Sequence, residues 1–377
     1  MSQEVQERKY YPHAVVWEIT FACNMRCLHC GTAAGQKRSD ELTHEEAIAL
    51  VDELCGLGAQ EITLSGGEPL LRKDWPQLAQ RIIDGGSKAY LITNGYAVDE
   101  KIVDEFERIN FTNIGVSFDG TEPTHNHIRQ REKSFKRAKN AMQMMSDRGN
   151  IRFCAITQVS NMNLNEMDEI KQILQDVGCR QWRIQMTTST GRMKEQDNMV
   201  LTTDKFPYLV DKLLEYKEEG KIDIDVGENI GFYGCKGTQL WDGKPYFGCF
   251  AGMRVAGITS NGEVRGCLSM PEYFNEGNIR DSSFTEIWDD PNNFMYNRVF
   301  RSSDAGGWCK ECKYLPLCRG GCATTSFSAT NMRANNPYCM YQIEKANGIE
   351  CEDNEMIQSL LDHVHKQLGG KVETVEK

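Results

Sequence analysis

Three cysteines near the start of the chain constrain it more than any other feature. Cys23, Cys27 and Cys30 have the spacing C-x3-C-x2-C and directly follow a mostly apolar run, residues 14–19. Three thiolates this close can reach one metal centre only if the backbone wraps around it, and a closed zinc site needs a fourth ligand. His29 lies between two of the cysteines, where we expect its ring to point elsewhere. An iron–sulfur cluster with one free iron therefore fits this spacing better than zinc.

Short β-rich runs alternate with amphipathic segments in the first half of the chain. The candidate strands are residues 14–20, 61–64, 89–93, 113–118, 152–158 and 181–186. Thr43 and Glu46 form a capping-box pattern, which predicts a helix running to Leu57. Such alternation predicts an α/β fold with a parallel sheet, and its regular recurrence favours a partial barrel over an open doubly wound sheet. The pattern alone leaves both architectures open.

Polar residues recur on one face of these strands, while the alternate positions are apolar. The polar set is Glu18, Thr20, Thr63, Ser65, Ser117, Asp119, Arg183 and Gln185. Near the C-terminal ends of barrel strands, such a face would form the floor of an active site. The alternative is an amphipathic sheet with this face in solvent, and helices on the other face favour the lumen.

The last third of the chain carries a second series of cysteines. It reads C-x12-G-x4-C from Cys249, then C-x2-C-x5-C-x3-C from Cys309, and ends at Cys339. Seven cysteines in this order are too many for a single metal centre. A pair of zinc knuckles is the alternative, because C-x2-C-x5-C-x3-C alone could bind zinc.

Together, the two cysteine patterns resemble radical S-adenosylmethionine (SAM) enzymes with a C-terminal SPASM domain, from about Val15 to Tyr341. The resemblance implies a partial (β/α)6 barrel followed by a smaller cysteine-rich domain that holds two auxiliary iron–sulfur clusters. It also implies a [4Fe-4S] cluster on Cys23, Cys27 and Cys30, whose free iron chelates SAM. In this family SAM is cleaved to a 5'-deoxyadenosyl radical that abstracts hydrogen from the substrate.

Loops at the strand ends resemble the family's cofactor contacts. Gly66-Gly67-Glu68-Pro69 lies one β-α unit after the cysteine loop and resembles the GGE motif, whose backbone and Glu bind the amino group of SAM. Paired glycines also let a backbone approach a ligand closely. The further cofactor-binding residues that the resemblance implies are Asn94, Ser117, Arg129 and Gln185. A solvated surface position is the alternative for Arg129.

The SPASM resemblance also implies which cysteines hold the auxiliary clusters. The distal cluster takes Cys309, Cys312, Cys318 and Cys339, and the proximal cluster takes Cys249, Cys267 and Cys322. Sulfatase-maturing enzymes supply a fourth proximal cysteine where this chain has Val255, and Cys235 is the best local substitute. If Cys235 does not reach, an open iron could bind a substrate thiolate. The remaining cysteines, Cys55, Cys154, Cys179 and Cys351, are expected mostly to be small buried hydrophobes.

Auxiliary clusters favour a net oxidation of the substrate. The resemblance implies a peptide or protein substrate, with a thioether or carbon–carbon crosslink formed in a ribosomally made peptide. Only 22 residues precede Cys23, so a leader would need a separate binding protein or none. Tetrapyrrole side-chain oxidation in heme synthesis and formylglycine formation are the alternatives, and Leu268 counts against the latter, because maturases carry Asp there. A non-catalytic iron–sulfur electron carrier is the non-enzymatic alternative.

Asp119 and Glu228 are nominated as acid–base residues, against the alternative that they are solvated. The resemblance implies an electron donor such as a flavodoxin or ferredoxin. The net charge of −11 argues against nucleic acid as the main partner. No run approaches the ~18 apolar residues of a membrane span, the N-terminus lacks signal-peptide features, and a cytoplasmic location is expected.

The expected organisation is an N-terminal extension (1–13), the barrel (14–230), the SPASM domain (231–345) and a C-terminal helix and tail (346–377). Met356, Leu360, Leu361 and Val364 have helical spacing and predict an amphipathic helix that docks on the body. The final residues, 371–377, are expected to be loose.

Overall fold

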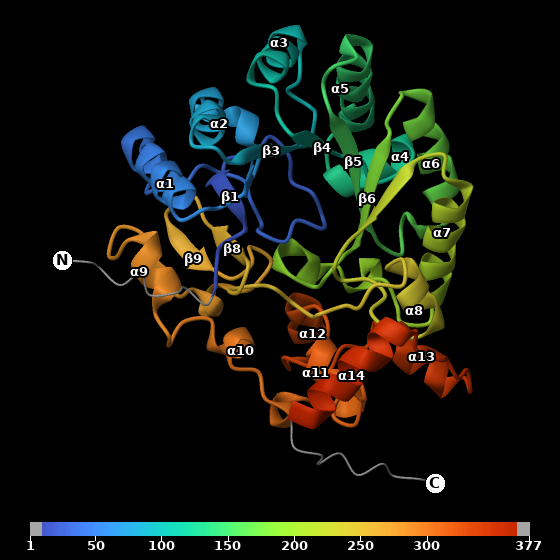
Figure 1. The fold of residues 1–377 in the computed structure, drawn as a ribbon. Helices are drawn as coiled ribbons and strands as arrows, with labels where there is room; N and C mark the ends of the chain where they lie inside the picture. Colours follow the sequence, from blue (N-terminus) through green and yellow to red (C-terminus); the bar gives the residue numbers. More distant parts are fainter. Residues whose placement is uncertain (1–9, 368–377) are drawn as a thin grey trace, which may run out of the picture.

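A single curved sheet organises the chain in the computed structural model, which describes residues 10–367 (Figure 1). The strand order is β10-β9-β8-β1-β2-β3-β4-β5-β6-β7. The strands are β1 (Ala14–Thr20), β2 (Glu61–Gly66), β3 (Lys88–Thr93), β4 (Asn113–Ser117), β5 (Phe153–Val159), β6 (Gln181–Met186), β7 (Asp223–Val226), β8 (Val255–Ile258), β9 (Glu263–Arg265) and β10 (Gly277–Asn278). Neighbours from β1 to β7 pair in parallel, β8 joins β1 in parallel, and β9 and β10 are antiparallel.

Helices cover the outer face of this sheet (Figure 1). They are α1 (His44–Gly56), α2 (Trp75–Asp84), α3 (Glu100–Ile109), α5 (Ser134–Arg148), α6 (Met167–Asp176) and α7 (Phe206–Glu219). A further helix, α4 (Glu122–Arg129), follows β4, and its last turn contacts the cysteine loop, where the Leu28 amide donates to the Ile128 carbonyl. The predicted partial barrel is confirmed, and all six predicted strands are present. Two parallel strands were missed, β7 and β8, because each has only four residues and too short a pattern to detect.

The predicted start of α1 is confirmed. The Thr43 side chain accepts from the Glu46 amide, and the Glu46 carboxylate accepts from the Thr43 amide. This reciprocal capping satisfies two backbone donors at the helix N-terminus. The buried face of α1, which includes Leu50 and Leu54, packs in the main core with the apolar strand positions such as Leu64. Each such fully buried side chain contributes about 1.5–3 kcal/mol.

The polar face of β1 lies inside the barrel. Glu18 is buried, and its carboxylate accepts from the backbone and hydroxyl of Ser260 at 3.1 and 3.0 Å and pairs with Arg38. Thr20 is also buried and donates to Glu41. These partners come from the segments that follow β1 and β8, and the burial of Glu18 and Thr20 agrees with the lumen prediction for this strand and not with the solvent alternative.

The C-terminal region is built mainly from short helices that pack below the barrel (Figure 1). They are α8 (Cys235–Leu240), α9 (Phe284–Asp289), α10 (Met295–Arg298), α11 (Leu315–Cys318), α12 (Ala323–Thr330), α13 (Met340–Ala346) and α14 (Glu355–Gln367). Because β8 pairs with β1, this region shares the sheet of the barrel. We propose residue 230 as the boundary between the two parts, since β7 ends at Val226.

The predicted C-terminal helix forms as α14 and docks on the body. Leu361 is buried, and Leu360 and Val364 pack against the same cluster, as predicted. The prediction for Met356 was wrong, because this residue is 57% exposed and the next residue, Ile357, is buried in its place. Residues 371–377, predicted to be loose, and residues 1–9 of the predicted N-terminal extension lie outside the described residues. Between residues 10 and 367, no helix combines the length and apolarity needed to cross a bilayer.

Candidate functional site

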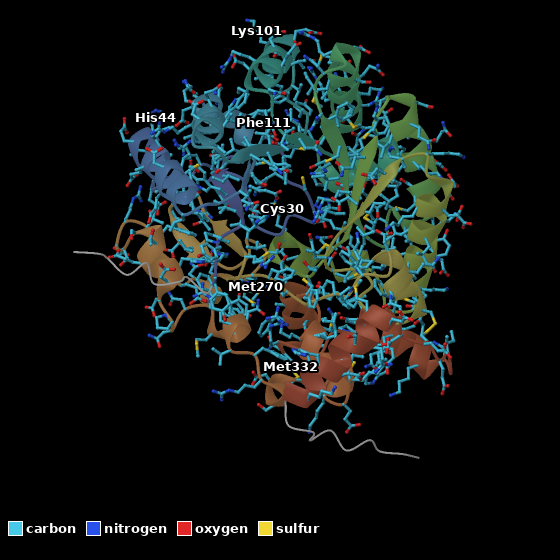
Figure 2. The ribbon with its side chains drawn as sticks, in the orientation of Figure 1. Cys30, His44, Lys101, Phe111, Met270 and Met332 are labelled. Carbon is cyan, nitrogen blue, oxygen red and sulfur yellow. A yellow bond between two sulfur atoms is a disulfide. The ribbon has the colours of Figure 1, made fainter. Side chains whose placement is uncertain are left out.

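The first cysteine set lies on the loop that follows β1, inside the ring of barrel elements, where Figure 2 labels Cys30. Backbone bonds fold the loop on itself: the Cys23 amide donates to Gly35, and the Cys30 amide donates to Cys27. Arg192 fixes it from outside by donating to the Cys27 carbonyl at 2.9 Å. The loop is therefore folded back on itself, as the predicted wrapping of the backbone requires.

The spacing of the thiols bears on the choice between zinc and an iron–sulfur cluster. In a tetrahedral zinc site, thiolate sulfurs lie about 3.8 Å apart, since Zn–S bonds are about 2.3 Å long. Within residues 10–367, the one trio of candidate ligand atoms that all lie within 4.8 Å of one another is Cys235, Glu344 and Cys351. The thiols of the first cysteine set are therefore not gathered within this distance of one another. In a cluster each thiolate binds a different iron, so its ligands need not lie so close.

When no metal is bound, burial also disfavours ionisation of the thiols in the first cysteine set. It raises the pKa of Cys23 to about 12, with a further contribution from the nearby Glu68 carboxylate. Cys27 is more deeply buried, and burial raises its pKa as well, against the opposing charge of Arg129. Bound iron supplies the positive charge that lets such thiols ionise.

His29 does not point towards the cysteines on either side of it. Its Nε2 atom lies 2.8 Å from Oδ2 of Asp119, at the end of β4. This confirms the prediction that the ring is directed elsewhere. The contact ties the cysteine loop to the floor of the barrel.

Asp119 is fully buried at the centre of a polar network. Its Oδ2 lies 2.5 Å from Nη2 of Arg129, and its Oδ1 accepts from the Gln158 amide at 2.9 Å. Although burial acts in the opposite direction, Arg129 and His29 hold the pKa of Asp119 below its usual range. A carboxylate with every oxygen engaged and a low pKa is a poor base. The contacts favour a positioning role over the predicted acid–base role.

Arg129 lies beside the first cysteine set. It is buried in the last turn of α4, and its Nη1 donates to Sγ of Cys27 at 3.8 Å. The surface alternative for Arg129 is thus wrong. Its guanidinium is committed to Asp119 and Cys27, a set of contacts that the sequence did not indicate.

His125 is a buried residue of this site that sequence reasoning missed. Its Nδ1 accepts from the Asp119 amide at 3.0 Å, so its proton resides on Nε2, which has no partner among the described residues. Burial and the charge of Arg129 lower the pKa of His125 to about 3. Nothing in the local sequence distinguishes this neutral histidine from a surface one.

The Gly66-Gly67-Glu68-Pro69 loop packs directly against the cysteine loop. A Cβ atom at Gly66 would lie 2.4 Å from the Thr20 carbonyl, and one at Gly67 would lie 2.3 Å from the Ala22 carbonyl. The Gly66 backbone also has a φ of +145°. Glycine is therefore required here for close packing of backbone on backbone, a reason different from the ligand approach that we predicted.

Glu68 supports this loop from behind. It is fully buried, and its carboxylate accepts from the Thr93 hydroxyl at 2.7 Å, the Asn94 amide at 2.8 Å and the Leu70 amide at 3.3 Å. Pro69 follows it as the first residue of the short 3-10 helix η1 (Pro69–Leu71). Burial outweighs these bonds and raises the pKa of Glu68 to about 7.

The metal-free protein should therefore lose stability as the pH rises towards neutrality. Because the folded-state pKa of Glu68 is raised, its contribution is fully present below the unfolded value, near 4.5, and is lost as the pH rises through about 7. Thermal denaturation across this range measures the effect. The Glu68→Gln variant should not show this pH-dependent loss of stability. Identical pH profiles for the wild-type and variant proteins would contradict the prediction.

The other predicted cofactor residues lie at neighbouring strand ends. Asn94, after β3, is buried, and its Nδ2 donates to Oδ1 of Asn24 in the cysteine loop at 2.7 Å. Ser117 ends β4 and is half-buried. Gln185, near the end of β6, is half-buried and packs closely against Gly227. Of the three, only Asn94 has a hydrogen bond from its side chain to the cysteine loop.

Glu228 is a surface residue. Its carboxylate accepts from Arg183 at 2.7 Å, and its side chain is 67% exposed. This placement favours the solvated alternative to an acid–base role.

Four C-terminal cysteines share one cavity. Cys309, Cys312, Cys318 and Cys339 line it together with aromatic side chains and Asn336. The Nδ2 atom of Asn336 is buried and has no hydrogen-bond partner among the described residues. An unpaired donor beside four thiols fits a cluster whose sulfurs accept hydrogen bonds.

The other three cysteines also lie close together. The thiols of Cys249, Cys267 and Cys322 interact electrostatically with one another, and Cys322 immediately precedes α12. Burial and the neighbouring thiols raise the pKa of Cys322 to about 12. The Ala251 amide donates to Sγ of Cys249 at 3.5 Å.

Cys235 lies elsewhere, which corrects its predicted role as the fourth proximal ligand. It forms a disulfide with Cys351, in the segment before α14. The Cys235 amide donates to the buried Glu344 carboxylate at 2.8 Å, which fixes this end of α8. Of the four remaining cysteines, most of which were predicted to be small buried hydrophobes, Cys351 is an exception because it forms this disulfide. Cys154 and Cys179 are buried as predicted, and Cys55 is half-buried.

Cys235→Ser should leave the iron content of the anaerobically reconstituted protein unchanged, because this sulfur is directed to Cys351. Cys249→Ser should lose the iron of one cluster. Iron and sulfide analysis checks both variants. Equal losses of iron would instead mean that Cys235 is a ligand.

A cavity of about 270 Å³ opens where β6 ends and α12 passes. Its lining includes the hydroxyl side chains of Thr187, Thr188, Ser189, Thr325 and Ser328. No Lys or Arg is among the residues that line it. It lies at the carboxyl end of the barrel strands, where enzymes of this architecture bind substrates.

Two family models match the chain. The Radical SAM superfamily model covers residues 17–177, and the SPASM model, an iron–sulfur cluster-binding domain, covers residues 249–313. The first contains the end of β1, the Cys23–Cys30 loop and β2 to β5, and the second contains Cys249, Cys267, Cys309 and Cys312.

Individual proteins are similar over most of the chain. An AdoMet-dependent heme synthase of Methanosarcina barkeri is 27% identical over 88% of this chain and 97% of its own length. The mycofactocin maturase MftC of Mycolicibacterium smegmatis is 25% identical over 87% of this chain and 83% of its own. The crystal structure of Streptococcus suis SuiB bound to S-adenosylmethionine has the same fold, with a TM-score of 0.69 at 15% identity, over 88% of this chain and 76% of that one.

Proposed function

The chain is a radical SAM enzyme with a C-terminal SPASM domain, and on that premise we propose that it oxidises the side chains of a tetrapyrrole. The main support for a tetrapyrrole substrate is the similarity to a heme synthase, which extends over 97% of that enzyme's length. This reverses the order predicted from the sequence, which placed a peptide substrate first. The electron-carrier alternative does not agree with the match to the radical SAM family.

Cys23, Cys27 and Cys30 would hold a [4Fe-4S] cluster with one open iron, which supplies the electron that cleaves SAM to a 5'-deoxyadenosyl radical. The task of the protein is to position SAM and exclude water. The glycine pair at Gly66 and Gly67 brings the second strand-end loop against the cysteine loop. We propose that backbone groups of this loop take the amino group of SAM, while the engaged Glu68 holds the loop in place.

Asp119 would keep this arrangement rigid. It joins the cysteine loop through His29, α4 through Arg129 and β5 through the Gln158 amide. Three elements of the barrel thus share one buried carboxylate. Displacement by about 1 Å can cost about a hundredfold in rate, which gives such a network functional value.

The two C-terminal cysteine sets would hold two auxiliary clusters. Their presence in the same chain supports an oxidation, because a substrate radical needs a site to which it can lose an electron. For a propionate side chain, the 5'-deoxyadenosyl radical would take one hydrogen atom and become 5'-deoxyadenosine, carbon dioxide would leave, and the remaining electron would pass to an auxiliary cluster held by the C-terminal cysteines. The product is a vinyl group, and the atoms and electrons balance.

Anaerobically reconstituted enzyme should be incubated with SAM, dithionite and iron coproporphyrin III. The expected product has lost carbon dioxide and two hydrogens per reacted side chain, in proportion to the 5'-deoxyadenosine formed. Liquid chromatography with mass spectrometry measures both. An unchanged tetrapyrrole in a reaction that cleaves SAM would overturn the proposal.

A peptide substrate is the second candidate, and the cavity beside β6 favours it. Hydroxyl groups such as those of Thr187 and Ser328 suit amide and side-chain hydrogen bonds, whereas propionates favour Arg or Lys, which this cavity lacks. The similarity to a mycofactocin maturase supports the same candidate. Loss of two hydrogens from a precursor peptide, measured by mass spectrometry, would identify a crosslink.

The partners follow from the chemistry. We propose a flavodoxin or ferredoxin as the electron donor, because the first cluster must be reduced before each turnover. For a peptide substrate, we also propose a separate protein that binds the leader segment of that peptide. The net charge of −11 supports small-molecule or peptide substrates over nucleic acid.

A further inference from the structure

Tyr296 has a buried hydroxyl group that makes no hydrogen bond within residues 10–367. It lies in α10, and no partner for its oxygen is found among the described residues. Buried hydroxyls almost always have a partner, so such an atom calls for an explanation. Its ring is held in place by an edge contact with Phe274, at 5.0 Å between centroids.

The hydroxyl is directed at the proximal cysteine set. A Cβ atom at Gly266 would lie 2.2 Å from the Tyr296 oxygen, so this oxygen rests on the backbone immediately before Cys267. The thiols of Cys249 and Cys267 both interact electrostatically with it. Glycine at 266 is thus what allows the hydroxyl to approach so closely.

The next residue locks α10 onto the same cysteine turn. Asn297 is fully buried, and its Nδ2 donates to the Cys249 carbonyl at 2.8 Å and to the Ala251 carbonyl at 2.7 Å. Its Oδ1 accepts from Arg333 at 2.7 Å. The position of α10 relative to Cys249 is therefore fixed by two hydrogen bonds, and the bond from Arg333 holds the Asn297 side chain in place.

We propose that Tyr296 donates its phenolic hydrogen to a sulfur of the proximal auxiliary cluster and thereby raises its reduction potential. This rests on the proposed function, in that Cys249, Cys267 and Cys322 must hold a cluster. A donor to sulfur stabilises the more negative, reduced cluster, and hydrogen bonds of this kind are a recognised means of setting iron–sulfur potentials. Tyr296 would thus set the potential at which this cluster accepts an electron from the substrate.

The test uses the full chain with Cys23, Cys27 and Cys30 replaced by alanine, so that only auxiliary clusters contribute signals. Tyr296→Phe in this background removes one oxygen atom. Redox titration monitored by electron paramagnetic resonance should show one auxiliary potential falling. A tenfold change in the one-electron equilibrium is the expected size, or about 59 mV. The second auxiliary potential serves as an internal standard.

Tyr273→Phe is the matched control, because Tyr273 is 71% exposed and loses the same atom. It should leave both potentials unchanged. Two unchanged potentials in Tyr296→Phe would overturn the proposal, as would loss of iron, which would make Tyr296 a ligand. Cys267→Ser tests the premise separately: undiminished iron in that variant would mean that the proximal set holds no cluster, whatever the role of Tyr296.

Discussion

Replacing Cys27 by serine should abolish SAM cleavage while leaving the iron held by the C-terminal cysteines in place. Cys27 is the buried member of the first set, and Arg129 donates to its sulfur at 3.8 Å. Serine has a similar shape but offers an oxygen where the softer iron site prefers thiolate. Chromatography of 5'-deoxyadenosine after reduction with dithionite measures the loss, and iron analysis measures the clusters that remain.

Cys154→Ser is the matched control for this prediction. Cys154 is also buried, but it lies in β5 beside Cys179 and belongs to none of the three cysteine sets. It should retain wild-type SAM cleavage. A Cys27→Ser protein that forms 5'-deoxyadenosine at the wild-type rate would contradict the assignment of the first set.

Features encoded by neighbouring residues could be predicted from the sequence. The capping box of Thr43 and Glu46 lies within one helical turn, and the six longer strands show their period-two pattern within five to seven residues. The spacing C-x3-C-x2-C is local as well. Each of these three features depends only on residues that are close together in the sequence, so a local pattern is enough to predict it.

Features that depend on the path of the chain could not be predicted. Cys235 and Cys351 are 116 residues apart, and the sequence around each of them does not indicate that they form a disulfide. The pairing of His29 with Asp119 spans 90 residues. Met356 illustrates a different failure, because it lies in the first turn of α14, where it is exposed while the next residue, Ile357, is buried.

The missed role of Arg129 arose in the same way. Its side chain looks like an ordinary helix-end arginine in the sequence, where it stands near the end of α4. Only the fold brings it against Asp119 and Cys27. Buried charges are rare unless paired, so both members of a pair must be located before either can be identified.

Asp119→Asn should destabilise the folded protein by about 3 kcal/mol. Asparagine keeps the shape of the side chain but leaves the buried Arg129 guanidinium without a counter-charge, beside a neutral His125. Denaturant unfolding of the metal-free protein under reducing conditions measures the difference. Because the folded-state pKa of Asp119 is lowered, its contribution is present above the unfolded value of about 3.9 and is lost only as the pH falls further. The difference should therefore be the same across neutral pH.

Two comparisons distinguish a lost ion pair from general damage. Glu228→Gln removes a carboxylate from the exposed pair with Arg183 and should change the stability by less than about 1 kcal/mol. Asp119→Asn combined with Arg129→Met should be more stable than Asp119→Asn alone, because the second change removes the uncompensated charge. Additive losses in the double variant would mean that the two side chains stabilise the barrel independently, and the carboxylate would then have no special role in holding the cysteine loop.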